Sequence, residues 1–184
     1  DMALGFELDL HVDPAEIVEV IRPLLPRELV STDPGGQVQI DMAASGKPME
    51  KLDFNFAVRG DHLTLSGGPL PDRSMGPVRV LLSSEGALQW ATGSVVIDKG
   101  ALEMGSRSRI SWSGTVGGLR SGSPRVDFSL GHLFFDLAEM AEPLRNVIPE
   151  KFSPLPGQFF KIDNIHISGP VPGGPVSMEI ENFL

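Results

Sequence analysis

The chain has 184 residues, a formal net charge of −9 and no cysteine. The acidic balance argues against nucleic acid, because phosphate binding needs clustered Lys and Arg. Without cysteine, disulfide bonds and thiolate metal sites are excluded. The sequence also has no apolar run of the roughly eighteen residues that a membrane-spanning helix needs.

The first predicted elements are a strand over residues 6–10 and a helix over 13–26. Asp13 is a suitable N-cap, Pro14 suits the first helical position, and Glu16, like Glu139 after Asp136, completes a pattern close to a capping box. Apolar residues at 17, 20, 21, 24 and 25 form one stripe, so this face is expected to lie on an apolar surface. A further strand follows over residues 35–41.

The middle of the chain alternates apolar and polar residues in short runs separated by Gly-containing segments. This pattern predicts a long antiparallel meander. Turns are expected at Gly60-Asp61, at residues 98–100 and at residues 114–118. The predicted strands are 52–58, 63–65, 78–82, 88–90, 94–97, 101–104 and 109–113.

The C-terminal part repeats the N-terminal pattern about 123 residues further on. Residues 13–26 and 136–149 align without a gap and share six identities in fourteen positions, including Asp13/Asp136 and Glu16/Glu139. Strands are expected over 126–130, 157–163, 166–169 and 176–180, so each unit is predicted to be strand, helix, strand.

We therefore expect a mainly β protein with two short α-helices, a large curled antiparallel sheet that forms a groove, and an internal repeat. The domain is predicted to span 1–184, with related units at about 1–66 and 121–184 joined by a meander over about 67–120. Because the chain begins at Asp1 and not at Met, we expect a fragment of a larger protein from which a signal peptide or membrane anchor has been removed.

Two short helices cover only part of a large sheet, so an apolar trough is expected. Core packing in a closed sandwich is the alternative for this apolar face, and for each residue taken alone it is the favoured role. The trough hypothesis predicts that apolar positions of alternating strands contact lipid. The candidates are Phe54, Phe56, Val58, Leu63, Leu65, Val78, Val80, Trp90, Ile97, Met104, Ile110 and Trp112.

No pattern in the sequence favours an enzyme. The chain has no Gly-x-Ser-x-Gly elbow, and its four histidines lack the spacing of a helical zinc site, so neither metal nor cofactor is predicted. His132 and Asp136 could meet at a helix start, where an N-capping role for Asp136 is the favoured interpretation. The recurring acidic pairs Glu16/Glu19 and Glu139/Glu142 suit first helical turns better than acid–base catalysis.

Over most of its length the chain resembles the AsmA-like proteins of Gram-negative envelopes. The similar residues are the strand into Asp136-Leu-Ala-Glu139, the helix ending at Pro149, residues 157–169, and the final Val176-to-Leu184 segment. This resemblance, which extends to TamB-like factors, implies a periplasmic protein anchored to the inner membrane outside this chain. It also implies phospholipid transport or outer-membrane assembly through an apolar β groove that holds acyl chains.

Two alternatives remain open. An architectural subunit of a type II secretion-like machine, similar to GspN, would pair its exposed sheet edges with other envelope proteins. A carbohydrate-binding sandwich would use Trp90 and Trp112 with their polar neighbours Gln89 and Ser111, although the chain has no Tyr.

Overall fold

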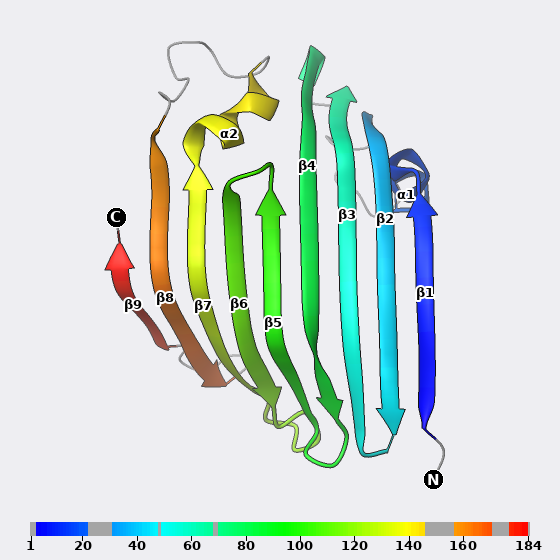
Figure 1. The fold of residues 1–184 in the computed structure, drawn as a ribbon, viewed down its shortest axis with the longest axis vertical. Helices are drawn as coiled ribbons and strands as arrows, with labels where there is room; N and C mark the ends of the chain where they lie inside the picture. The colour runs from blue at the N-terminus through cyan, green and yellow to red at the C-terminus, as the bar shows by residue number, and fades with distance from the viewer. Residues whose placement is uncertain are drawn as a thin grey trace.

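The computed structural model describes residues 3–21, 31–47, 49–67, 70–145, 157–170 and 177–183. Within these ranges the chain forms one antiparallel sheet of nine strands with short helices at one end (Figure 1). The strands are β1 (Leu4–Val12), β2 (Thr32–Lys47), β3 (Lys51–Gly67), β4 (Leu70–Gln89), β5 (Ser94–Met104), β6 (Ser108–Gly117), β7 (Arg125–Asp136), β8 (Phe159–Pro170) and β9 (Ser177–Phe183).

The strands are hydrogen-bonded in chain order from β1 to β9, so the sheet is a pure meander. Each strand pairs with its sequence neighbour, and β1 and β9 form the two edges. The predicted class, mainly β with an antiparallel sheet and two short α-helices, is confirmed. The sheet is open and twisted, without a second sheet against either face in the described ranges, so the closed-sandwich alternative is wrong for this part of the chain (Figure 1).

The strands are longer than predicted because several glycines lie within strands. Residues 52–58 and 63–65 belong to one strand, β3, which continues through Gly60-Asp61 with a shift in register. Residues 78–82 and 88–90 were predicted as two strands, but 78–89 lie in β4 and only Trp90 falls beyond its end. The predicted turn at 98–100 is likewise a bulge inside β5.

The predicted turn at residues 114–118 is also displaced. Gly114 and Gly117 lie in β6, and the chain reverses after Gly118. A glycine inside a strand is often a bulge or a place where a neighbour approaches closely. Composition alone does not separate these roles from a turn, since both require the small side chain.

The helices lie at one end of the sheet (Figure 1). Helix α1 (Pro14–Ile21) begins after β1 and contacts β2, and the Asp13 carboxylate accepts a hydrogen bond of 2.9 Å from the Ala15 amide. Helix α2 (Leu137–Ala141) follows β7 and continues into the single turn η2 (Glu142–Leu144). The predicted helix ends at Pro26 and Pro149 lie outside the described residues.

Strand, helix and strand follow in this order in both related units, as β1–α1–β2 and as β7–α2–η2–β8. The contacts of the two helices differ. Helix α1 lies against the strand that follows it, whereas α2 and η2 cross the short β5–β6 hairpin and reach β4 (Figure 1). Both α2 and η2 thus lie at the end of the sheet, next to the β5–β6 hairpin, whose strands are shorter than β4.

Candidate functional site

The two faces of the sheet have different chemistry. Side chains alternate between faces along a strand, and residues directly opposite on neighbouring strands share a face. The register therefore assigns almost every strand position to one face. Through the bulges in β3, β5 and β7 the apolar positions stay on the same side.

One face, called here the apolar face, consists of rows of apolar side chains that cross strands β1 to β8. One row is Leu10, Ile40, Val58, Leu82, Leu102, Ile110, Leu133 and Ile162. The next row towards the β2–β3 turn is Leu8, Met42, Phe56, Ser84, Gly100, Trp112, Leu130 and Ile165.

Little of this face is covered by the described residues. The four apolar β1 side chains Leu4, Phe6, Leu8 and Leu10 expose 40–53% of their surface. Only Ala44, Ala87, Ile162 and Ile165 are buried apolar residues in the described ranges. A conventional core is therefore absent from the part of the chain that the structure describes.

The apolar face is large for a monomer. Seven spacings of about 4.8 Å separate β1 from β8, and the eight residue steps from Leu52 to Gly60 rise about 3.3 Å each, so the face measures roughly 34 by 26 Å, or about 900 Å². The largest apolar patch of a typical monomeric protein covers about 300–600 Å², and larger patches mark sites of interaction. This face is the strongest candidate for a functional surface.

The register places eleven of the twelve predicted lipid-contacting residues on the apolar face. These are Phe54, Phe56, Val58, Leu63, Leu65, Val78, Val80, Ile97, Met104, Ile110 and Trp112. The twelfth, Trp90, lies just beyond β4 and exposes 39% of its surface. The prediction missed the apolar residues of β1, β2, β7 and β8, although their alternation with polar residues was visible.

Glycines on this face make room for aromatic rings. A methyl group at Gly100 would overlap the Trp112 indole, and one at Gly114 would overlap the Phe128 ring. A methyl group at Gly86 would overlap the Val96 carbonyl oxygen and crowd the tip of the Phe54 ring. The rings thus lie flat over the glycines of neighbouring strands, so that they project little from the apolar face.

The opposite face is polar and carries many small side chains, among them Ala43, Ala57, Ser83, Ala101 and Ser111. Three shallow hollows of about 670, 530 and 480 Å³ lie there. Large charged residues such as Glu7, Glu85 and Arg109 border them. These hollows are polar surface depressions and differ from the apolar trough expected from the sequence.

Polar pairs on this face join neighbouring strands or residues two apart on one strand. The His132 Nδ1 lies 2.7 Å from the Asp163 carboxylate, and the Lys161 ammonium lies 2.6 Å from the same group. Hydrogen bonds from Lys161 and His132 lower the pKa of Asp163. The alternative meeting of His132 with Asp136 does not occur. No group of three or more His, Asp or Glu residues that could hold a metal ion lies within the described ranges.

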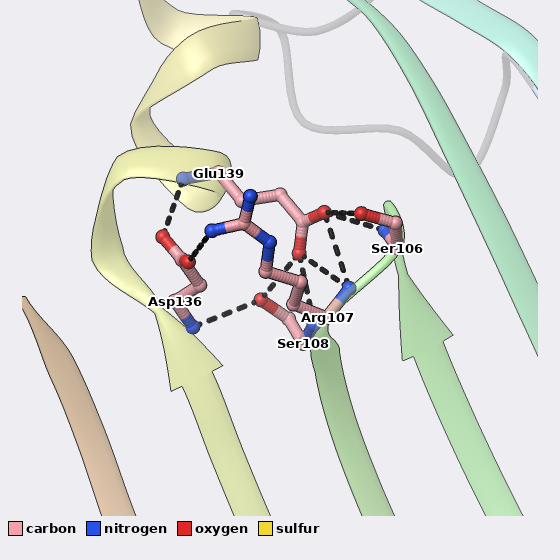
Figure 2. Close-up of polar contacts among 5 residues, drawn as sticks. All are labelled: Ser106, Arg107, Ser108, Asp136 and Glu139. Carbon is pink, nitrogen blue, oxygen red and sulfur yellow. Dashed lines mark hydrogen bonds and ion pairs between the residues drawn. The ribbon is translucent and has the colours of Figure 1, made fainter. Parts of the chain in front are cut away.

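Asp136 is the predicted N-cap of α2. Its carboxylate accepts a hydrogen bond of 3.0 Å from the Glu139 amide and an ion-paired hydrogen bond of 2.7 Å from Arg107 (Figure 2). These two contacts lower the pKa of the Asp136 carboxyl. Its backbone amide donates to the Ser108 hydroxyl at 3.2 Å.

Glu139 does not fold back to Asp136, so the predicted capping box does not form. Its carboxylate instead accepts hydrogen bonds from the backbone amides of Ser106, Arg107 and Ser108 at the β5–β6 turn (Figure 2). Burial opposes ionisation of this carboxyl, but the hydrogen bonds from the turn outweigh it and lower its pKa to about 2. Glu139 thereby fastens α2 to the end of the sheet.

The residues that the sugar-binding alternative groups together do not all lie on one face of the sheet. Ser111 and Trp112 are consecutive in β6 and therefore face opposite sides of the sheet. Trp112 lies in the row with Gly100 and Leu130, and its immediate cross-strand neighbours offer no amide side chain.

Comparison with known protein families finds no match, and neither curated proteins nor solved structures match the chain. Within the described ranges no helix has the length and hydropathy to cross a membrane.

Proposed function

We propose that this chain is a non-enzymatic lipid-handling protein whose apolar sheet face binds acyl chains. The observation that supports the proposal is an apolar face of about 900 Å² that the described residues leave largely uncovered. In the fuller form of the proposal, the protein belongs with the AsmA-like proteins, acts in the periplasm and takes part in phospholipid transport or outer-membrane assembly. An anchor outside the chain would hold it at the inner membrane.

Acyl chains match the chemistry of this face. Removing each methylene from water contributes about 0.8 kcal/mol, so a surface that covers several methylenes lowers the barrier to carrying a lipid across an aqueous gap. The rows offer many similar aliphatic and aromatic contacts without a deep enclosed pocket. Such a surface suits transport, because a single tight site would trap its cargo.

The groove belongs to the same proposal. The sheet is open in the described ranges, and a groove would form if the strands curled further around the apolar side, leaving head groups in water. The internal repeat is part of this view, since two related units joined by a meander would lengthen the same apolar surface. Bulges in β3, β5 and β7 are places where strands bend more easily.

The test compares two neighbouring substitutions on opposite faces. Ile110→Asp places a carboxylate on the apolar face between Leu102 and Leu133, while Ser111→Asp places one on the polar face between Ala101 and His132. Both variants and the native protein are purified without detergent from a bacterial host and extracted for lipid mass spectrometry. Circular dichroism and denaturant titration establish that each variant is folded.

We expect the native protein and Ser111→Asp to carry phospholipid, and Ile110→Asp to lose most of it. A folded native protein that carries no lipid, and that takes up none from phosphatidylethanolamine–phosphatidylglycerol vesicles, would refute the proposal. Equal lipid content in both variants would also refute it, because the bound lipid would then not depend on the apolar face.

An architectural role is a second candidate, and the edge of β1, which no described strand pairs, favours it. In a secretion-like assembly the sheet would be extended by a neighbouring protein, with the apolar face covered by that assembly. Lipid-free protein that forms complexes of defined mass with envelope proteins would favour this role over lipid transport.

A further inference from the structure

Strand β1 is an unusually unprotected sheet edge. Its nine residues pair with β2 along their whole length without a bulge, and no described strand covers the other side. Soluble proteins usually protect such edges with Pro, Lys, bulges or short strands, and β1 has none of these. An edge of this kind is a template for an added strand.

The charge of β1 restricts which strand fits. Its polar-face side chains include Glu7 and Asp9, both exposed, and Asp9 lies directly opposite Asp41 of β2. His11 is the sole basic side chain on β1, 3.5 Å from the Asp9 carboxylate. An incoming strand therefore meets acidic groups on one face and the apolar row of Leu4 to Leu10 on the other.

A second copy of β1 is a poor partner. Antiparallel pairing centred on Leu8 would keep the two apolar faces aligned, but it would set Glu7 of each copy opposite Asp9 of the other. Like charges directly opposite each other destabilise a strand pair. Basic residues on the polar face of the incoming strand would reverse this effect.

Strand β6 shows what fits beside the related strand of the same protein. The sequence repeat aligns Asp13, after β1, with Asp136, at the end of β7. Beside β7 lies β6, antiparallel, with Ile110 and Trp112 on the apolar face and Arg109 on the polar face. Arg107 next to β6 binds Asp136 at 2.7 Å. No described strand takes the place of β6 beside β1.

We propose that the free edge of β1 binds, by antiparallel strand addition, an extended segment of a partner protein in which apolar residues alternate with Lys or Arg. The apolar residues of this segment would extend the rows of the apolar face, and its cations would oppose Glu7 and Asp9. The proposal rests on the edge and its charges, and it stands whether or not the apolar face binds lipid.

The probe is a fluorescein-labelled peptide of residues 107–117 of this chain, the sequence of β6 with Arg107 in front. If Ser111 takes the position opposite Asp9 that it takes opposite His132 in β7, residue 113 falls opposite Glu7, because β1 lacks the bulge of β7. Three peptides are compared by fluorescence anisotropy: the native sequence, a Ser111→Lys/Ser113→Lys form and a Ser111→Glu/Ser113→Glu form. A scrambled peptide with the composition of the lysine form measures binding in the absence of alternating apolar and polar residues.

We expect the lysine form to bind about fivefold more tightly than the native peptide, because two opposite-charge pairs are added. The glutamate form should bind more weakly than the native peptide by a similar factor. Higher salt should reduce these differences, since the charges are exposed. Hydrogen exchange should slow at β1 amides when the lysine peptide binds.

The protein variant Glu7→Lys/Asp9→Lys should invert the order of the three peptides. The control Asp98→Lys/Asp127→Lys makes the same change in net charge on inner strands and should leave the order unchanged. The proposal is wrong if no peptide binds the native protein, if the scrambled peptide binds equally well, or if both double variants have the same effect. It is also wrong if exchange slows elsewhere in the sheet and not at β1.

Discussion

The attachment of helix α2 to the sheet depends on one carboxylate, and Glu139→Gln tests this dependence. The substitution keeps the shape of the side chain but removes the charge that three backbone amides of the β5–β6 turn stabilise. The shift of the Glu139 pKa from 4.5 to about 2 corresponds to roughly 3 kcal/mol. Because the carboxylate is partly exposed, we expect a loss of about 2 kcal/mol in the free energy of unfolding at neutral pH.

The pH dependence gives a sharper test. A lowered pKa stabilises the folded protein above the unfolded value of 4.5, and this contribution is lost as the pH falls towards 2. The difference between the native protein and Glu139→Gln should therefore shrink across this interval. Urea denaturation followed by circular dichroism, at several pH values, measures it.

The control for this experiment is Glu142→Gln. Glu142 is exposed and pairs with Arg145 at 3.2 Å, three residues further along, so its loss should cost less than about 0.5 kcal/mol. In Glu139→Gln alone, hydrogen exchange should accelerate at the amides of residues 106–108. Equal destabilisation by the two variants, or a difference that persists unchanged to pH 2, would refute the role assigned to Glu139.

Two further predictions concern the sheet itself. Gly100→Val should destabilise the protein by about 1–3 kcal/mol and alter tryptophan fluorescence, because the new side chain would displace the Trp112 ring. Gly117→Val should cost much less, since nothing lies near that position. A similar loss of stability for both variants in denaturant titration would contradict the packing described. Asp163→Asn should destabilise the protein at neutral pH. Because hydrogen bonds lower the Asp163 pKa below 3.8, the difference in stability between the native protein and the variant should fade as the pH drops below this value. The unfolding midpoints of both proteins, measured at a series of acidic pH values, check this.

The alternation of apolar and polar residues predicted much of the sheet. Residues 52–58 alternate strictly, and the structure places their apolar members on one face of β3. The period of two fixes which face a side chain takes, so the apolar face followed from sequence wherever a strand was recognised. The same pattern in residues 6–10 predicted β1 correctly.

The turns were less predictable, and the reason is physical. Gly86 and Gly100 have the composition of turn residues, but they lie within strands, where the backbone of Val96 and the ring of Trp112 occupy the space beside them. The partner that requires the missing side chain is distant in sequence or lies on the next strand. Local composition therefore shows that a small residue is needed without showing why.

The role of Glu139 was hidden for a similar reason. An Asp followed three residues later by Glu predicts a capping box, and Asp136 does cap α2. The carboxylate of Glu139, however, has a better partner in the turn at residues 106–108, about thirty residues earlier in the chain. Three converging amides stabilise a carboxylate more than the single amide of a capping box does.

The sheet of the described ranges, with so few buried side chains, is incomplete as a unit of stability. If all of the roughly 900 Å² of apolar face were removed from water, about 20 kcal/mol of favourable free energy would become available, at about 25 cal/mol per Å². That amount exceeds the total stability of most domains. Any molecule that covers part of the face should therefore stabilise the fold in proportion to its affinity and concentration. Ligand binding and folding of this chain are accordingly expected to be coupled, because the surface that would bind the ligand is the surface that a globular domain would use as its core.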